Sequence, residues 1–171
     1  SFGHGINTNL LQLTKGYAII SNGGYDVKPT LIKKETEVYK KTIITKATSQ
    51  KINSILRKIV VSGTAKLANV DGYEIGGKTG TANKTINGVY TNKKINTFAS
   101  VFPISKPQFV FVVLIDEPQI NNSYIYEYRD GSGFKLKGAP RNTAGWTSVE
   151  VAGKIIEKIG PILATKYIEI N

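Results

Sequence analysis

Residues 73–82 read Tyr-Glu-Ile-Gly-Gly-Lys-Thr-Gly-Thr-Ala, and the rest of the chain is interpreted around this stretch. It predicts a strand that ends in a cationic, hydroxyl-bearing segment with little side-chain bulk. Gly77 and Gly80 flank Lys78 and Thr79, so the backbone of a ligand can approach where side chains are missing. The ammonium and the hydroxyls would supply charge and hydrogen bonds to that ligand. The alternative is a solvated Lys-Thr-Gly turn, which the tripeptide taken alone favours.

The segments after this stretch predict an antiparallel meander. The Asn-Gly dipeptide at 87–88 is the strongest hairpin signal in the chain, so the strand that carries Lys78 is expected to turn back toward residues 96–102. Residues 109–115 form an unbroken apolar run, which is typical of a strand buried on both faces. Three consecutive antiparallel strands result.

Helical signals surround the meander. Asn9 is an N-cap before apolar residues at helical spacing, which predicts a helix at about 10–21, and a second helix is predicted from about 48 to 62. Residues 147–150 read Thr-Ser-Val-Glu, a capping box that opens a final helix through Leu163. The order of elements predicts an α+β fold in which helices pack on an antiparallel sheet.

The connecting segments give weaker signals. Residues 25–31 alternate, but Pro29 restricts them to an edge strand or an extended arm. Residues 38–39 and 43–44 predict another short strand. Residues 119–145 are polar and rich in glycine, with tyrosines in alternation, and are predicted to form a long loop that is functional or mobile.

Composition limits the classes of protein to which the chain belongs. The 171 residues suit one domain, and the absence of cysteine excludes disulfides and zinc-thiolate sites within them. No run of about 18 apolar residues is present to cross a bilayer. The net charge of +11 suggests a basic module that binds nucleic acid or an anionic polymer, but the lysine pairs are scattered and not interleaved with aromatic residues, which favours a solvated surface.

Several motifs occur together in one order. Lys78-Thr79-Gly80-Thr81 resembles the third signature of the penicillin-binding proteins and serine β-lactamases. The whole set resembles the class B, division-type penicillin-binding transpeptidases (FtsI-like), and it comprises Ser-Phe-Gly-His-Gly at 1–5, Leu-Gln-Leu at 11–13, Gly-Thr-Ala at 63–65, residues 77–82, the strand at 109–118 and Thr-Ala-Gly-Trp at 143–146. This resemblance covers nearly the whole chain.

The resemblance implies a role for each residue of the signature. Lys78 would maintain a proton and charge network near a nucleophilic serine and help to bind the substrate carboxylate. Thr79 and Thr81 would offer hydroxyls to the substrate, and the Thr81 backbone N–H would be one donor of an oxyanion hole. Gly80 would let a stem peptide or a β-lactam lie along the strand as an added strand. No metal and no cofactor are implied.

The catalytic signatures expected upstream of Lys78 are missing from these residues. The family takes its nucleophile and base from Ser-x-x-Lys and Ser-x-Asn elements that precede the Lys-Thr-Gly strand. The chain has no Ser-x-Asn, and its one Ser-x-x-Lys spacing, Ser132 to Lys135, follows the strand within a glycine-flanked segment. Residues 1–171 are therefore expected to be the C-terminal portion of one transpeptidase domain, without its nucleophile and inactive alone.

The other candidate residues are interpreted as structural and not as catalytic. His4, the only histidine, has no adjacent serine and is interpreted as a polar residue at a helix approach. Trp146 and the tyrosines are expected to pack rather than to bind ligands. Asp116 and Glu117 point to opposite faces if extended, so they are not expected to act as an acid/base pair.

The resemblance implies a serine-type D,D-transpeptidase that cross-links peptidoglycan at the division septum. Its ligands would be stem peptides and β-lactams, its partners the membrane proteins of the division complex, and nucleic acid is not expected. The parent protein would lie at the periplasmic face of the bacterial inner membrane, anchored by an N-terminal helix outside these residues. The alternatives are a β-lactamase or β-lactam sensor of the same superfamily, and the basic binding module.

Overall fold

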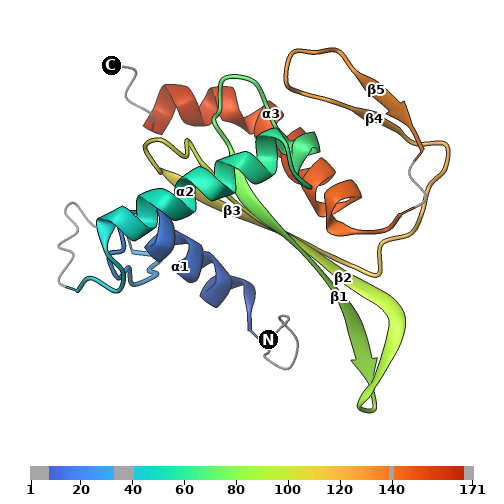
Figure 1. Cartoon of the computed structure of the whole chain (residues 1–171), viewed down its shortest axis with the longest axis horizontal. Helices are drawn as coiled ribbons and strands as arrows, with labels where there is room; N and C mark the ends of the chain where they lie inside the picture. The colour runs from blue at the N-terminus through green and yellow to red at the C-terminus, as the bar shows by residue number, and fades with distance from the viewer. Residues whose placement is uncertain (1–7, 33–40, 139–140, 168–171) are drawn as a thin grey trace.

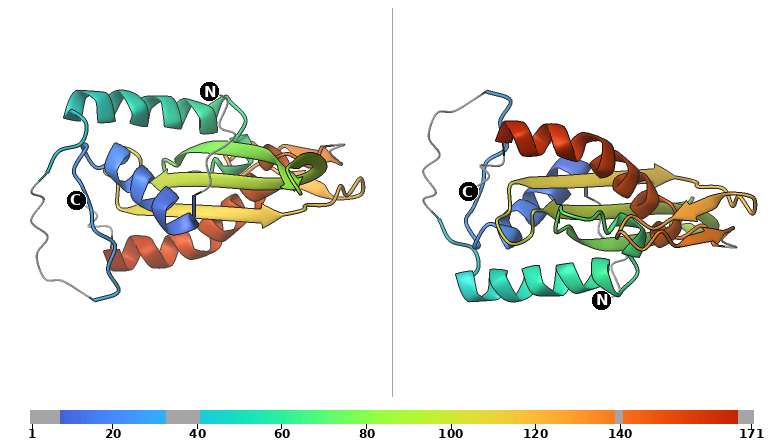
Figure 2. Two further views of the ribbon diagram at one scale, coloured as in Figure 1. Left: turned by 90° about the horizontal axis from the view of Figure 1, so that it is seen from below. Right: turned by 90° about the horizontal axis from the view of Figure 1, so that it is seen from above.

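The computed structural model describes residues 8–32, 41–138 and 141–167. The helices and strands in these ranges are α1 (Leu10–Ser21), α2 (Lys46–Val61), η1 (Lys66–Ala68), β1 (Gly76–Ile86), β2 (Val89–Phe102), β3 (Phe109–Asp116), β4 (Ile125–Glu127), β5 (Lys135–Lys137), η2 (Ala144–Trp146) and α3 (Ser148–Tyr167). Figures 1 and 2 show α2 and α3 on opposite sides of the sheet that β1, β2 and β3 form. The α+β prediction is confirmed. No helix in the described ranges is both long and apolar enough to span a bilayer.

The predicted meander is present. The strand order is β1-β2-β3, with both neighbouring pairs antiparallel. Asn87 and Gly88 form the turn with φ angles of 52° and 79°, as a hairpin turn with two left-handed residues requires. The signature lies near the start of β1 and not at its end, because β1 continues to Ile86. Beyond the end of β3, β1 and β2 continue as a two-stranded ribbon, which projects away from the helices in Figure 1.

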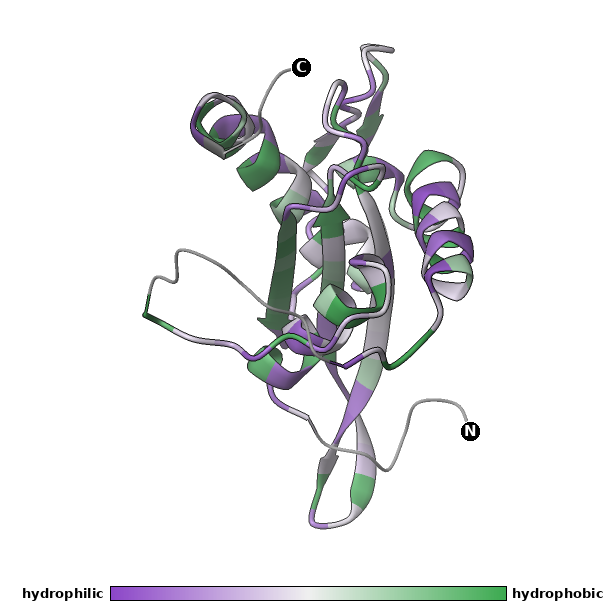
Figure 3. Ribbon diagram, turned by 90° about the vertical axis from the view of Figure 1, so that its left-hand side faces the viewer, coloured by the Kyte–Doolittle hydropathy of each residue, from purple (hydrophilic) through white to green (hydrophobic). Residues whose placement is uncertain are grey.

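Two apolar clusters lie on the two faces of the sheet. Phe98 and Phe102 pack with Val149 and Ile156 of α3, whereas Val101 packs with residues of α1 and α2, because neighbouring side chains of a strand point to opposite faces. Figure 3 shows β3 as a continuous hydrophobic strand at one edge of this sheet. The prediction that β3 is buried on both faces is wrong, since its residues are half-buried or exposed along this edge.

The first two helices follow their sequence signals. Asn9 and Gln12 form a capping box at the start of α1, and Gly23 and Gly24, with φ angles of 95° and 92°, follow its end. The second helix begins earlier than predicted, because the Thr45 hydroxyl accepts a hydrogen bond from the Thr48 N–H at 3.1 Å and caps it there.

The third helix spans the predicted residues, but the predicted capping box is wrong. The Thr147 hydroxyl donates to the Thr143 carbonyl oxygen at 3.1 Å, and the Glu150 carboxylate pairs with Arg129 at 2.9 Å. Both side chains therefore have partners other than those of a helix cap.

The connecting segments differ most from prediction. Residues 25–31 form no strand, apart from an isolated bridge between Tyr25 and Thr42, and 43–44 form none. The predicted loop at 119–145 contains the β4–β5 hairpin and η2, and Tyr126 of β4 is buried in the core, so the alternating tyrosines marked a strand. The motif at 1–5 and residues 38–39 lie outside the described residues.

Candidate functional site

The signature lies on an open edge of the described sheet. The Glu117 N–H donates to the Lys94 carbonyl oxygen at 2.8 Å, so Lys94 directs its backbone polar groups toward β3. Backbone N–H and C=O groups alternate in direction from one residue to the next along an antiparallel strand. The pairing of β1 with β2 therefore directs the N–H and C=O groups of Lys78 and Gly80 toward β2. The N–H and C=O of Thr79 and Thr81 therefore point to the open edge of β1.

Thr79 and Thr81 also line a cavity of about 540 Å³. The Thr79 hydroxyl shares a hydrogen bond of 2.9 Å with the Thr64 hydroxyl, which follows α2. The Thr81 hydroxyl accepts a hydrogen bond of 3.0 Å from the Ala144 N–H at the start of η2. Two segments distant in sequence thus hold the two hydroxyls of the signature.

Lys78 and Gly80 lie on the other face of the strand. Side chains alternate along β1, so these two residues face the side of α1 and α2, whereas Thr79 and Thr81 face the side of α3. The Lys78 ammonium is exposed and donates to the Thr79 carbonyl oxygen at 2.6 Å. The structure brings the four residues together along one edge, but it does not direct their side chains into one cavity.

The two glycines that flank Lys78 and Thr79 differ in role. A Cβ on Gly77 would lie 2.6 Å from the ring of Phe98, so the missing side chain makes room for the core and not for a ligand. A Cβ on Gly80 would have its nearest neighbour, in Thr97, at 3.9 Å, and the residue is exposed. Only Gly80 of this pair fits the predicted approach of a ligand backbone.

Sequence reasoning missed most of the cavity wall. The remaining lining residues come from the loop after α2, from η1 and from the segment between β4 and α3, and they are Ser62, Gly63, Thr64, Lys66, Leu67, Tyr128, Arg141, Thr143, Gly145 and Trp146. Trp146 packs edge-on against Tyr126, with ring centroids 5.1 Å apart, so the predicted packing role is confirmed, although Trp146 also lines the cavity. A Cβ on Gly145 would lie 2.7 Å from the Thr64 carbonyl oxygen, so glycine permits this close approach.

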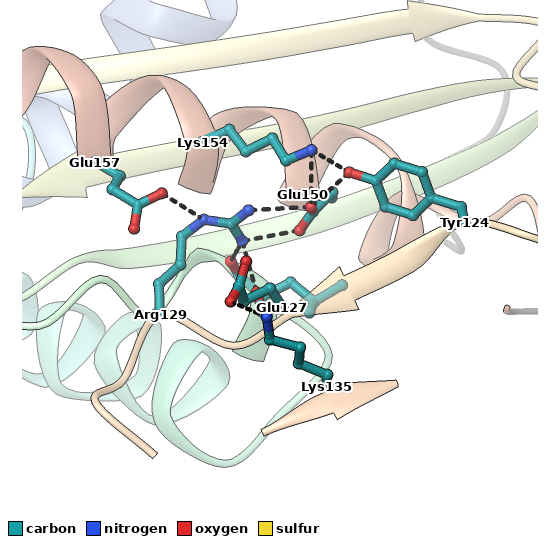
Figure 4. Close-up of polar contacts among 8 residues, drawn as sticks. Tyr124, Glu127, Arg129, Lys135, Glu150, Lys154 and Glu157 are labelled. Carbon is teal, nitrogen blue, oxygen red and sulfur yellow. Dashed lines mark hydrogen bonds and ion pairs between the residues drawn. The ribbon is translucent and has the colours of Figure 1, made fainter. Parts of the chain in front are cut away.

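A buried ion pair fixes the β4–β5 hairpin beside the cavity (Figure 4). The Arg129 guanidinium donates to both carboxylate oxygens of Glu150, at 2.9 and 3.0 Å, and to the Leu67 carbonyl oxygen at 2.9 Å. Burial alone would lower the pKa of Arg129, but the hydrogen bonds and charge of Glu150 outweigh it and raise that pKa. Because Tyr128 precedes Arg129 directly and Leu67 lies in η1, the ion pair holds two lining residues of the cavity.

The one Ser-x-x-Lys spacing does not form a nucleophile and base. The Ser132 hydroxyl donates to Asp130, and the Lys135 ammonium binds Glu127 at 2.8 Å. The described residues contain no group of three or more histidine, cysteine, aspartate or glutamate side chains that could hold a metal ion. His4 lies outside the described residues.

Asp116 and Glu117 lie closer together than expected from an extended chain. Both carboxylates accept hydrogen bonds from the Lys84 ammonium, at 3.0 and 2.8 Å. Glu117 has a φ of 49°, so the chain leaves the extended conformation there and both side chains reach one cation. Hydrogen bonds from Lys84 and then from Lys93 lower the pKa of Glu117, so the pair is an ion-pair cluster at the base of the ribbon.

The family model of the penicillin binding protein transpeptidase domain matches residues 1–132. The chain belongs to this family. The probable peptidoglycan D,D-transpeptidase FtsI of Caulobacter vibrioides is 32% identical over 180 residues, which cover 97% of this chain and 28% of the relative. The probable peptidoglycan D,D-transpeptidase PenA of Neisseria flavescens is 35% identical over 127 residues, 72% of this chain and 32% of the relative. The chain therefore spans about a third or less of the length of these curated relatives.

Solved structures agree with this family. The apo transpeptidase domain of penicillin-binding protein 3 from Burkholderia pseudomallei has a TM-score of 0.73 at 24% identity, over 94% of this chain and 44% of the other. Penicillin binding protein 3 from Mycobacterium tuberculosis, in complex with aztreonam, has a TM-score of 0.67 at 28% identity, over 92% and 37%. The fold is thus that of part of a penicillin-binding transpeptidase domain, as the signature predicted.

Proposed function

We propose that this chain supplies the substrate-binding edge of a serine D,D-transpeptidase that cross-links peptidoglycan during cell division. Its relatives include named D,D-transpeptidases and the stage V sporulation protein D of Bacillus subtilis, which is 33% identical over 132 residues. The observation that carries the proposal is the open edge of β1, toward which the backbone N–H and C=O groups of Thr79 and Thr81 point, as the pairing of a strand-like ligand requires. Residues 1–171 are then the C-terminal portion of the catalytic domain.

In this proposal a serine from outside the chain attacks the carbonyl carbon before the terminal D-alanine of a stem peptide. The Thr81 N–H donates to the oxygen that becomes negative, a contribution worth roughly 3–4 kcal/mol of transition-state stabilisation. D-Alanine leaves with a proton, and the acyl group then passes from the serine to the amine of a neighbouring stem peptide. β-Lactams acylate the same serine as mimics of the donor strand.

The remaining roles in substrate binding and catalysis are distributed over the two faces of β1. The hydroxyls of Thr79 and Thr81 donate to the carboxylate of the donor from the cavity side, where Arg141 adds positive charge. Lys78, on the other face, holds a positive charge near the serine, which therefore approaches from the side of α1 and α2. Gly80 lets the ligand backbone lie against β1.

The cellular location and the partners of the parent protein follow from the proposed activity. We propose that the parent protein acts on the periplasmic side of the inner membrane, held there by an N-terminal helix, and that membrane proteins of the division complex bind it. A cell-wall substrate requires the active site to lie outside the cytoplasm, and relatives in cell-wall synthesis support this location.

Covalent labelling by a fluorescent penicillin tests the function. The full-length protein should be labelled, and Lys78→Ala should lose the label. Lys135→Ala should keep it, because Lys135 pairs with the exposed Glu127 carboxylate in the β4–β5 hairpin. A label that persists supports a transpeptidase, and rapid hydrolytic turnover would indicate a β-lactamase. The 171-residue chain alone should stay unlabelled, and labelling of it would contradict a nucleophile outside these residues.

A further inference from the structure

We propose that Asn96 is a positioning residue that orients the Thr81 hydroxyl toward the substrate, an inference that rests on the proposed transpeptidase function. Asn96 lies on β2 directly opposite Thr81 of β1, and both face the side of α3. Its side chain is completely buried. It does not line the cavity, so it acts through its neighbours and not on the ligand.

One side-chain amide holds both ends of the turn that contains η2. The Asn96 amide nitrogen donates to the Asn142 carbonyl oxygen and to the Thr147 hydroxyl, each at 2.7 Å. A backbone carbonyl oxygen only accepts hydrogen bonds, so the atom that faces it must be the nitrogen. The Thr147 hydroxyl donates its own proton to the Thr143 carbonyl oxygen at 3.1 Å, which leaves it free to accept from Asn96.

The middle of this turn contacts the candidate site. The Ala144 N–H donates to the Thr81 hydroxyl oxygen at 3.0 Å. A hydroxyl that accepts from a fixed N–H still has its own proton to donate, and the fixed N–H restricts the directions in which that proton points. The Thr81 proton is thus oriented in advance toward the cavity, where the carboxylate of a donor strand or of a β-lactam would accept it.

Stability alone does not explain an asparagine at this position. Its carbonyl oxygen is buried, and no donor in the described ranges reaches it. Such an oxygen destabilises a fold, and asparagine is depleted in strands. The two hydrogen bonds that the amide nitrogen donates are the contribution that an apolar residue at position 96 would lack.

The test measures the second-order rate constant for acylation of the full-length protein by a carboxylate-bearing fluorescent penicillin. Asn96→Ala should lower this constant about tenfold, the loss expected when the hydrogen bond from Ala144 no longer orients the Thr81 hydroxyl. Thr81→Val also lowers it, and Asn96→Ala should add almost nothing in the Thr81→Val background, because both changes remove the same oriented proton. The amide hydrogen of Ala144 should exchange faster in Asn96→Ala.

Asn53→Ala is the matched control. The Asn53 side chain also donates to one backbone carbonyl, that of Ser21 at 3.0 Å, and also has a buried oxygen without a donor in the described ranges, but it lies between α1 and α2. It should change thermal stability and leave acylation unchanged. If Asn96→Ala does not fold, Asn96→Val suits a buried strand, lacks the donor and should show the same loss of rate.

The outcomes separate this inference from the function on which it rests. Failure of the unmodified protein to react with the penicillin would refute the transpeptidase function itself. With the unmodified protein reactive, an Asn96→Ala rate equal to that of Asn53→Ala would refute the positioning role. The positioning role would also be refuted if the fold-decrease in acylation rate of the double variant equals the product of the Asn96→Ala and Thr81→Val decreases, because that result indicates two independent effects.

Discussion

Replacement of Glu150 by glutamine should destabilise the protein by about 3–5 kcal/mol, because it leaves the buried Arg129 guanidinium without its buried charged partner. The two side chains are only 4% and 5% exposed. Glutamine has the shape of glutamate, so the change removes charge and one acceptor without opening a cavity. The effect on stability therefore reports the electrostatic role of the pair.

The magnitude follows from what remains around Arg129. Its contact with Glu157, at 3.1 Å, stays, but the Glu157 side chain is 55% exposed, and a pair of this kind contributes only about 0–1 kcal/mol. The Tyr124 hydroxyl, which donates to Glu150 at 2.9 Å, also loses a charged acceptor. The contacts that Arg129 keeps, with Glu157 and with the carbonyl oxygens of Leu67 and Glu127, do not replace the buried negative charge that offsets the desolvation of its guanidinium.

Urea unfolding of the purified full-length protein, followed by circular dichroism, measures the difference. Glu157→Gln is the matched control, and it should cost less than about 1 kcal/mol because its carboxylate is solvated. The double variant Arg129→Met/Glu150→Met should recover part of the loss, since it removes both buried charges together. Equal losses for Glu150→Gln and Glu157→Gln would refute the assignment of the stabilisation to the buried pair.

Three further predictions concern Gly145, Glu117 and Arg141. Gly145→Ala places a Cβ 2.7 Å from a backbone oxygen and should lower the free energy of unfolding in urea by about 1–3 kcal/mol. Gly16→Ala, in open space on α1, should raise it by about 0.5–1 kcal/mol. A change of the same sign in both variants would contradict the close contact at Gly145. The lowered pKa of Glu117 means that its ion pairs stabilise the ribbon above the ordinary pKa of a glutamate, and this stabilisation is lost as the pH falls through the lowered value. Lys84→Met should raise this pKa in a carbon-13 NMR titration, and an unchanged value would exclude Lys84 as its cause. Arg141→Gln should slow acylation by carboxylate-bearing penicillins about tenfold, an effect that added salt reduces, and a salt-independent rate would refute the charge interaction.

The parts of the fold that were predicted correctly depend on local signals. The turn at 87–88 needs two left-handed residues, and Asn-Gly is the dipeptide that adopts them most readily, so the hairpin follows from two adjacent residues. The start of α1 likewise depends on Asn9 and Gln12, three positions apart. The Arg129–Glu150 pair spans 21 residues, and the cap-like spacing of Glu150 favoured a different partner. Burial decides whether the Glu150 side chain caps the helix or pairs with Arg129, and burial depends on the folded chain.

The arrangement of the candidate site was predictable in one respect and not in another. A period of two along β1 requires Lys78 to face away from Thr79 and Thr81, whatever the rest of the chain does. Which face each side chain occupies depends on packing. Gly77 leaves room for the ring of Phe98, and this ring packs with α3. The hydroxyls of Thr79 and Thr81 therefore lie on the α3 side, and Lys78 lies on the opposite side. A ligand on the open edge is thus contacted from both faces. If Lys78 assists the nucleophile as proposed, the serine and its base must lie on the α1 and α2 side of the edge. With that serine replaced by cysteine and a mild oxidant added, a disulfide to Thr79→Cys should then form less readily than one to Gly80→Cys.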